Sequence, residues 1–272
     1  MIRLEKSDRA DVVTLTLKRP EKRNALNQQL ISELTRVIES LSSDESVRVI
    51  VLTGSGNTFS AGADLQALEE MQKASYEENL ADSQKIAHLF TSIRSCEQPV
   101  IAKVNGHAIA GGFGLLTACD FAIVDNRARL GFTEVRIGFM PAIAMTFLRA
   151  RLPDLALRDL LLTGRLISAQ EALEFGLVNR VVDGARIDDA VRELADEIVR
   201  ETSREAVAAT KRMLFDIEFM SQREALRVAV ERNATMRKST DCQDGIRAFL
   251  EREDPPWKKA FENDSSVNDP IS

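Results

Sequence analysis

Short stretches of almost uninterrupted apolar residues constrain the fold of this chain more than any other feature. They cover residues 47–53, 100–104 and 121–124, and such runs are typical of strands buried in a parallel sheet. Residues 11–17 alternate polar and apolar side chains, which predicts a further strand. A helical pattern starts at Asn27. Strands that alternate with helices predict an α/β fold with a parallel sheet and right-handed crossovers.

The last third of the chain has a helical pattern. Long amphipathic helices are predicted at 187–201, 204–216 and 222–238. The spacing of a capping box occurs at Ser168 with Glu171, at Ser221 with Glu224, and at Thr240 with Gln243. We therefore expect three parts: a core at 1–199 that carries the functional site, a C-terminal helical region at 200–262, and a polar, disordered tail at 263–272.

The composition limits the partners that the chain can bind. With 44% hydrophobic residues the chain can bury a real core, and its formal net charge of -6 disfavours a nucleic-acid surface. No apolar run approaches the roughly 20 residues that a membrane helix needs. The N-terminus lacks the apolar core of a secretion signal. We expect a cytoplasmic protein that binds neither nucleic acid nor membrane.

The cysteines and histidines do not predict a metal site. Cys96, Cys119 and Cys242 are odd in number and match no metal-ligand spacing, so we expect reduced, mostly packed thiols. His88 and His107 are the two histidines of the chain, too few for a histidine-rich zinc site.

Two segments rich in small residues are candidates for a functional site. Residues 59–65 follow one buried strand, and residues 105–114 join another buried strand to an apolar helix. Small residues at a strand exit let backbone N–H groups face a ligand. The glycine pair Gly111-Gly112 would aim free N–H groups and the positive end of the helix dipole outward. Each segment taken alone is more often a sign of tight packing.

Together the two segments resemble the crotonase family, which is the enoyl-CoA hydratase/isomerase family. That family has a Ser-Ala-Gly-Ala-Asp-like stretch, here 60–64, and then an Asn-Gly-x-Ala-x-x-Gly-Gly stretch, here 105–112. Residues 19–26, 163–169 and 176–179 are similar to further family segments, so the resemblance covers residues 2–255. It implies a crotonase-like spiral of ββα units with a C-terminal helical trimerisation region, and a homotrimer or a dimer of trimers.

The resemblance also implies an acyl-CoA site. A CoA thioester gains negative charge on its carbonyl oxygen as an enolate forms, and each preorganised N–H donor is worth roughly 3–4 kcal/mol there. By match to the family motif the donors are the backbone N–H groups of Ala63 and Gly111, and Glu134 is the acid/base carboxylate. The acyl-CoA substrate brings its own coenzyme A, so no separate cofactor and no metal are expected. Binding of substrate and CoA maps onto Lys22, Arg23, Ala25, Ala61, Ala63, Asp64, Leu65 and Gly111.

One catalytic position departs from the family pattern. Two-carboxylate hydratases carry a second Glu where this chain has Gly114. The leading interpretation is an enoyl-CoA hydratase that uses Glu134 alone. The alternatives are a Δ3-Δ2 enoyl-CoA isomerase, which needs one carboxylate, and a dehydratase of a branched 3-hydroxyacyl-CoA. If the pocket has room, Gly114→Glu is expected to increase hydration.

Two other classes fit the sequence less well. A serine peptidase of related fold would need a nucleophilic Ser with a His and an Asp, and the glycine-rich helix entry contains no Ser. A non-catalytic RNA-binding protein is disfavoured by the acidic charge and by Glu134. Turnover of crotonyl-CoA would separate the enzymes from such a binding protein.

Overall fold

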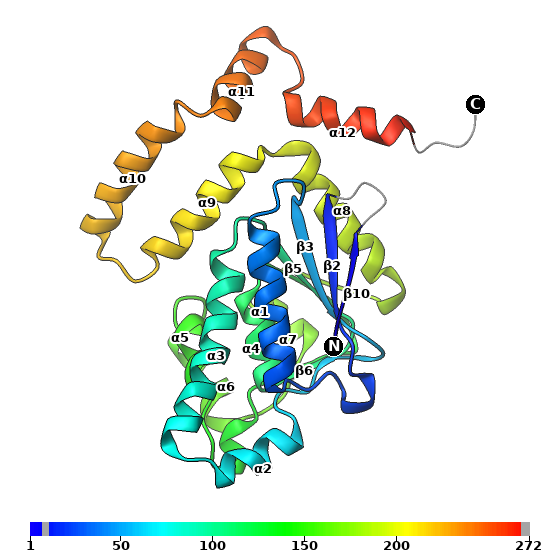
Figure 1. Cartoon of the computed structure of the whole chain (residues 1–272), viewed down its shortest axis with the longest axis vertical. Helices are drawn as coiled ribbons and strands as arrows, with labels where there is room; N and C mark the ends of the chain where they lie inside the picture. Colours follow the sequence, from blue (N-terminus) through cyan, green and yellow to red (C-terminus); the bar gives the residue numbers. More distant parts are fainter. Residues whose placement is uncertain (7–10, 268–272) are drawn as a thin grey trace.

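Two β-sheets form the centre of the chain, with helices on both sides (Figure 1). The structure is a computed structural model that describes residues 1–6 and 11–267. In the first sheet β1 (Ile2–Lys6) runs antiparallel to β2 (Val12–Leu17), and the other neighbours are parallel. These strands confirm the four predicted from the sequence. Their spatial order is β1 (Ile2–Lys6), β2 (Val12–Leu17), β3 (Val49–Gly54), β5 (Val100–Val104), β7 (Phe121–Asp125) and β10 (Arg180–Val182).

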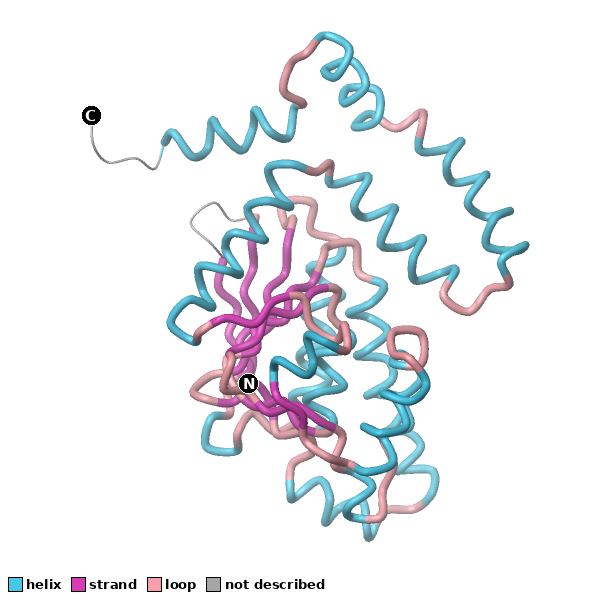
Figure 2. The backbone as a smooth tube through the Cα atoms, turned by 180° about the vertical axis from the view of Figure 1, so that it is seen from behind, coloured by secondary structure: helices cyan, strands magenta, loops and turns pink. Residues whose placement is uncertain are grey.

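A second, smaller sheet was not predicted from the sequence. Its first three strands are parallel, and each follows directly after a strand of the first sheet. A helical segment comes after each of them, so the chain repeats a strand–strand–helix unit. Figure 2 shows the strands gathered at the centre with helices around them. The predicted spiral of ββα units is therefore confirmed. The spatial order in this sheet is β4 (Thr58–Ser60), β6 (His107–Ile109), β8 (Arg129–Gly131) and β9 (Ile167–Ser168).

The central strands of the first sheet are buried on both faces. Ile50 and Leu52 of β3 belong to the main core, which lies under α1 (Gln28–Ser42), α3 (Tyr76–Ser95) and α4 (Gly111–Ala118). Val49 and Val51 belong to a second cluster on the opposite face, which α8 (Ile187–Glu201) covers. Alternate residues of a strand face opposite sides, so two buried faces require a nearly continuous apolar sequence.

The remaining helices of residues 1–203 connect or cover the strands. The long helix α3 was not predicted, because its buried side chains, among them Leu89 and Phe90, all lie in its second half. The others are η1 (Pro20–Lys22), α2 (Leu65–Lys73), η2 (Glu134–Ile137), α5 (Ala142–Leu148), α6 (Asp154–Thr163), α7 (Ala169–Glu174) and η3 (Gly184–Arg186).

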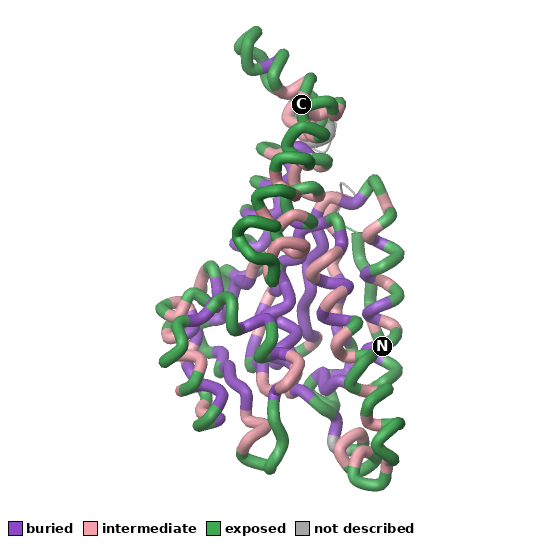
Figure 3. Tube along the Cα trace, turned by 90° about the vertical axis from the view of Figure 1, so that its left-hand side faces the viewer, coloured by how far each residue is buried: buried purple, intermediate pink, exposed green. Residues whose placement is uncertain are grey.

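The C-terminal helical region extends away from the sheets, and most of its surface is exposed (Figure 3). It contains α9 (Arg204–Ile217), α10 (Gln222–Met236), α11 (Thr240–Glu251) and α12 (Pro256–Val267), of which α12 packs against α8. None of the helices within the described residues is long and apolar enough to cross a membrane.

Two expectations for this region are corrected. Ser239 caps α11 with its side chain, and Thr240 is the first helical residue, so the capping box predicted at Thr240 is wrong. The tail expected at 263–272 is helical as far as Val267, and residues 268–272 lie outside the described residues. The capping boxes at Ser168 and Ser221 are confirmed.

A buried lysine joins the C-terminal region to the core. Lys211 of α9 is 6% exposed and donates to the carbonyl oxygens of Ile93 and Gln98 and to an Asp120 oxygen at 2.7 Å. Its Nζ also lies 3.3 Å from the Cys96 sulfur. Burial alone would lower the pKa of Lys211, yet the nearby Asp120 carboxylate holds that pKa above its usual value. The ammonium group is therefore charged and fully partnered where α9 meets α3.

Candidate active site

Three neighbouring parallel strands bring the predicted catalytic positions together. The strands β4, β6 and β8 lie side by side in the second sheet, and their carboxyl ends meet at one edge. Ala63 follows β4, Gly111 follows β6, and Glu134 follows β8, each within three residues of its strand. Ligands of parallel sheets characteristically bind beyond the carboxyl ends of the strands. The topology thus places all three residues at the edge where a ligand is expected.

Two backbone N–H groups at this edge are free to bind a ligand. Among the described residues, neither the Ala63 N–H nor the Gly111 N–H donates a hydrogen bond. Gly111 is the first residue of α4, so its N–H has no acceptor in the helix and lies at the positive end of the helix dipole. The two loops are in contact, because a Cβ built on Gly62 would lie 3.2 Å from the Gly111 nitrogen. Gly62 also has a φ of +84°, which favours glycine.

Gly112 allows α4 to approach β4 closely. A Cβ built on Gly112 would lie 2.3 Å from the Ser60 carbonyl oxygen, well inside contact distance. The second glycine of the pair therefore has a packing role, and the first presents the N–H group. The packing interpretation of the glycine pair therefore holds for Gly112, and ligand approach at Gly111 stays a prediction.

The residue before Gly111 holds a strained backbone. Ala110 has φ 52° and ψ -125°, a combination that residues with a Cβ rarely adopt. Its N–H donates to the Gly131 carbonyl oxygen at 2.8 Å, which ties β6 to β8 at this corner. The corner turns the chain so that α4 begins directly after Ala110, at Gly111.

Ala110→Gly is therefore expected to raise thermal stability. Glycine adopts positive φ without steric cost, and the gain is about 1 kcal/mol after allowing for its greater freedom in the unfolded chain. Differential scanning calorimetry of the purified variant would measure the change. Ala118→Gly, at the other end of the same helix, is the control, and it should lower stability by a similar amount. A lower melting temperature for Ala110→Gly would show that this corner is not strained.

A buried ion pair and a buried amide hold the loop that carries Ala63. Arg19 donates to Asp64 at 2.6 Å and to the Ala25 carbonyl oxygen at 2.6 Å. Asn24 is fully buried and donates to the carbonyl oxygens of Ser55 and Thr58. The Leu26 N–H donates to the Gly62 carbonyl oxygen, so the turn and the loop form one unit. Arg19 and Asn24 were missed from the sequence, although both lie in the motif at 19–26.

The position of Asp64 agrees with one of two expectations. Asp64 was named among the binding residues, with a local salt bridge as its favoured role, and its residue is only 4% exposed. Its oxygens accept from Arg19 and from the Gln66 N–H at the start of α2. Burial would raise its pKa, but these two donors hold the pKa of Asp64 below its usual value. The carboxylate supports the loop as the salt-bridge interpretation expects, and a contact between Asp64 and the substrate stays a prediction.

Glu134 has the properties of an acid/base group. It begins η2, is half-buried, and its Oε2 atom is buried with no hydrogen-bond partner among the described residues. Burial raises the pKa of its carboxyl group above the usual value, and this effect exceeds that of its backbone hydrogen bond. A raised pKa brings a carboxyl group nearer to the working pH of a general acid or base. Glu134 therefore has one oxygen without a hydrogen bond among the described residues, and a carboxyl group with a raised pKa.

The other predicted binding residues surround the same loop. Lys22 and Arg23 are exposed on the turn formed by η1, which leaves their side chains accessible to phosphate groups. Ala25 is buried and Ala61 half-buried, so both act through shape and backbone. Leu65 is the first residue of α2, and its side chain lies outside the described part of the structure. The prediction that this set binds CoA stays a prediction.

Gly114 lies in a packed environment. It is buried in α4, and a Cβ built on it would lie 3.0 Å from the Phe90 ring and 3.2 Å from the Ala144 Cβ. The expectation that Gly114→Glu increases hydration, or at least leaves it measurable, assumed room in the pocket. The packing opposes an increase, and the effect on hydration stays a prediction. A glutamate at residue 114 would have to displace a buried aromatic ring. As a catalytic position, Gly114 contributes no functional group of its own.

Other titratable groups do not gather at this edge. His107 is exposed at the start of β6, and its Nδ1 accepts from the Arg129 N–H, so it lies at the end of the strand away from Gly111. Cys96 and Cys119 are buried free thiols, and burial raises the pKa of Cys96. No cluster of three or more His, Cys, Asp or Glu side chains suited to a metal ion occurs in residues 1–6 and 11–267.

Comparisons with known proteins agree with this geometry. The family model described as enoyl-CoA hydratase/isomerase matches residues 7–260. A Thermus thermophilus protein assigned as an enoyl-CoA hydratase is 39% identical over 94% of this chain and 99% of its own length. Carnitinyl-CoA dehydratase of Escherichia coli K12 is 33% identical over 91% of this chain and 95% of its own. The crystal structure of an enoyl-CoA hydratase from Mycobacterium smegmatis superposes with a TM-score of 0.89 at 32% identity, covering 94% and 98% of the two chains.

A ββα spiral that matches enoyl-CoA hydratases along almost the whole chain defines a class of acyl-CoA enzymes. The chain belongs to the enoyl-CoA hydratase/isomerase family, also called the crotonase family. The resemblance stated from the sequence motifs is thereby confirmed.

Proposed function

We propose that this chain is an enoyl-CoA hydratase that adds water reversibly to a 2-enoyl-CoA with Glu134 as its single acid/base carboxylate. The observation that carries the proposal is the unpartnered, half-buried Glu134 oxygen at the strand edge that also presents the Ala63 and Gly111 N–H groups. The enoyl-CoA hydratases among its relatives support the same reaction.

In the proposed reaction the thioester carbonyl oxygen accepts hydrogen bonds from the Ala63 and Gly111 N–H groups. Glu134 takes a proton from water as the water oxygen bonds to C3, and the C2–C3 π electrons move toward the carbonyl to form an enolate. The protonated Glu134 then returns the proton to C2, and the carbonyl re-forms. Each N–H donor contributes roughly 3–4 kcal/mol to the stability of the developing oxyanion.

The test uses crotonyl-CoA in water enriched in ¹⁸O. Hydration gives 3-hydroxybutyryl-CoA that carries one labelled oxygen, which mass spectrometry detects. The isomerase alternative is favoured by the single carboxylate, because moving a proton from C2 to C4 needs one base. Conversion of a 3-enoyl-CoA without label, together with no label from crotonyl-CoA, would replace the hydratase proposal with the isomerase. A panel with branched 3-hydroxyacyl-CoAs tests the dehydratase alternative.

We expect the acid limb of the pH profile to report Glu134. Burial raises the pKa of this carboxyl group, and the water-attack step needs its ionised form, so kcat/KM should fall on the acid side with an apparent pKa above that of an ordinary Glu. Measuring kcat/KM for crotonyl-CoA from acid to neutral pH gives this value. An acid limb at or below the pKa of an exposed Glu would contradict the assignment.

The C-terminal region is proposed to form a homotrimer or a dimer of trimers. Large apolar side chains are exposed on its helices and on the turn after α9, and such patches mark protein interfaces. Sedimentation velocity at micromolar concentration is expected to show a trimer or hexamer, and Phe249→Ser should shift it toward monomer. A stable wild-type monomer would refute this. The exposed residues include Leu214, Phe219, Leu226, Val230, Phe249 and Leu250.

The cofactor need, the location and the pathway are proposed from the proposed reaction. The reaction needs no separate cofactor, because coenzyme A arrives as part of the substrate. We place the chain in the cytoplasm, in fatty-acid breakdown by β-oxidation.

A further inference from the structure

A continuous row of side chains connects the end of α9 to the helix that presents the Gly111 N–H. Arg94 of α3 donates to Glu218 at 2.6 Å, and the two side chains are 12% and 9% exposed. The Arg94 guanidinium also lies over the Phe147 ring of α5, 5.0 Å from its centroid. Glu218 follows directly after α9, so this ion pair joins the C-terminal region to α3 and α5 together.

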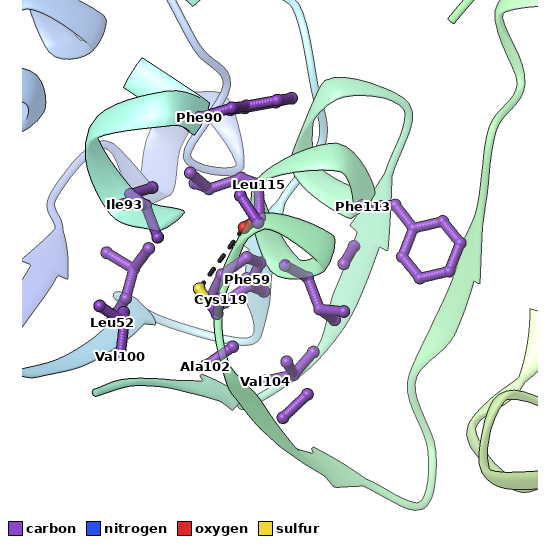
Figure 4. Close-up of a cluster of buried hydrophobic side chains, with 14 of the residues drawn as sticks. Leu52, Phe59, Phe90, Ile93, Val100, Ala102, Val104, Phe113, Leu115 and Cys119 are labelled. Atoms are coloured by element: carbon purple, nitrogen blue, oxygen red, sulfur yellow. Dashed lines mark hydrogen bonds between the residues drawn. The ribbon is translucent and has the colours of Figure 1, made fainter. Parts of the chain in front are cut away.

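The row continues from Phe147 to α4. The Phe147 and Phe90 rings are tilted by 59° with their centroids 6.3 Å apart, which is a favourable aromatic arrangement. Phe90 is 1% exposed and packs on Gly114, which has no side chain to keep the ring away. Figure 4 shows Phe90 over the turn of α4 that carries Leu115. A shift of the Phe90 ring therefore displaces the backbone of α4.

Gly114 and Gly111 lie one helical turn apart on the same helix face, because residues i and i+3 are neighbours on a helix. The helix is short and nearly every residue in it is buried, so packing fixes its position. A misplacement of about 1 Å in a catalytic group costs on the order of 10²-fold in rate. Whatever holds the Phe90 ring against Gly114 therefore holds the Gly111 N–H.

We propose that Arg94 is a positioning residue for the oxyanion donor. Through Phe147 and Phe90 it fixes α4, and through Glu218 it makes the position of the Gly111 N–H depend on the docking of the C-terminal helices. The inference rests on the proposed function of the Gly111 N–H. It extends that function by coupling the site to the region through which the chain is proposed to assemble.

The chain offers a matched control for this row. Arg204 at the start of α9 also forms an ion pair with the α3 side of the core, donating to Glu97 at 3.1 Å. That pair is more exposed and contacts no ring in the row from Phe147 to Gly114. Arg204→Met thus removes an α9 ion pair without disturbing the support of α4.

The test compares full-length Arg94→Met, Arg94→Lys and Arg204→Met with the wild type. We expect Arg94→Met to lower kcat for crotonyl-CoA about tenfold or more while KM changes less than about threefold, because the lost interaction acts in the transition state. Arg94→Lys keeps the charge for Glu218 and should recover most of the rate. Arg204→Met should stay within about twofold of wild type.

A binding measurement separates this inference from the hydratase proposal. Acetoacetyl-CoA carries a thioester carbonyl that the N–H pair can bind, and its β-keto group makes the enolate easy to form, whereas free CoA has no acyl carbonyl. Arg94→Met should weaken acetoacetyl-CoA binding about tenfold relative to free CoA, whether or not the chain hydrates crotonyl-CoA. If Arg94→Met fails to fold, Phe147→Leu and Glu218→Gln test the same row. Each should lower kcat more than it changes KM, and each should weaken acetoacetyl-CoA binding relative to free CoA. An unchanged ratio of the two affinities, or an equal loss in Arg204→Met, would overturn the proposal.

Discussion

Glu134→Gln is expected to lower kcat for crotonyl-CoA by at least about 10²-fold, the low end of the range for a general acid–base group. Gln keeps the shape of the side chain but cannot accept the proton from water or return it to C2. Binding of CoA should survive, because the Ala63 and Gly111 N–H groups and the η1 turn are untouched. Stopped-flow absorbance for the chemical step and calorimetry for CoA binding give the two values.

The same variant should be more stable than wild type at neutral pH. Burial raises the pKa of Glu134 in the folded chain, so the stabilisation that this carboxyl group gives is present below its unfolded pKa and lost as the pH rises through its folded pKa. Gln does not ionise, so Glu134→Gln avoids that loss. The difference in the free energy of unfolding between Glu134→Gln and the wild type should vanish in acid. Glu171→Gln is the control, since hydrogen bonds from Ser168 and Arg165 lower the pKa of Glu171 and removing its charge should destabilise instead. A Glu134→Gln enzyme with near-normal turnover would refute the catalytic assignment.

Lys211→Met is expected to produce the largest loss of stability among single substitutions considered for this chain. The Met side chain fills the space but leaves Asp120 without its cation and two carbonyl oxygens, of Ile93 and Gln98, without their donor. Breaking a buried pair in this way costs about 3 kcal/mol, even with Asp120 partly accessible to water. Chemical denaturation followed by circular dichroism measures the change.

The exposed pair between Lys259 and Glu253 gives the control for that experiment. Its side chains are 52% and 58% exposed, so Lys259→Met should cost less than about 0.5 kcal/mol. Since the Lys211 group has a raised folded pKa, its stabilisation should persist through neutral pH and fall only in strong alkali. Equal denaturation midpoints for the two variants would show that the Lys211 cluster does not anchor α9.

The sequence predicted those strands and helices whose buried side chains form a clear pattern along their own residues. The strand β3 is apolar at nearly every residue because both of its faces are covered. The helix α8 has buried apolar residues at helical spacing over its full length. The second sheet escaped prediction because β4, β6 and β8 have three residues each, too few to show any periodicity.

In the candidate site, too, the residues in local motifs were predicted, and the contacts between residues far apart in the chain were not. Ala63, Gly111 and Glu134 were found through motif resemblance, and the structure brings them to one strand edge. The partner of Asp64 was missed because Arg19 lies 45 residues away in the chain. The packing of Phe90 on Gly114 was missed for the same reason, since nothing in the local sequence of α4 indicates which ring will lie against it.

The spiral arrangement has a consequence for how activity is gained during folding. Ala63, Gly111 and Glu134 come from three successive ββα turns, and the strands that carry them are too short to persist without the larger sheet behind them. A chain that has ordered only its first two turns would have the N–H pair but not the carboxylate. Enzymatic activity should therefore return during refolding as a single late phase, after most of the helical signal, and no partially ordered species should turn over substrate.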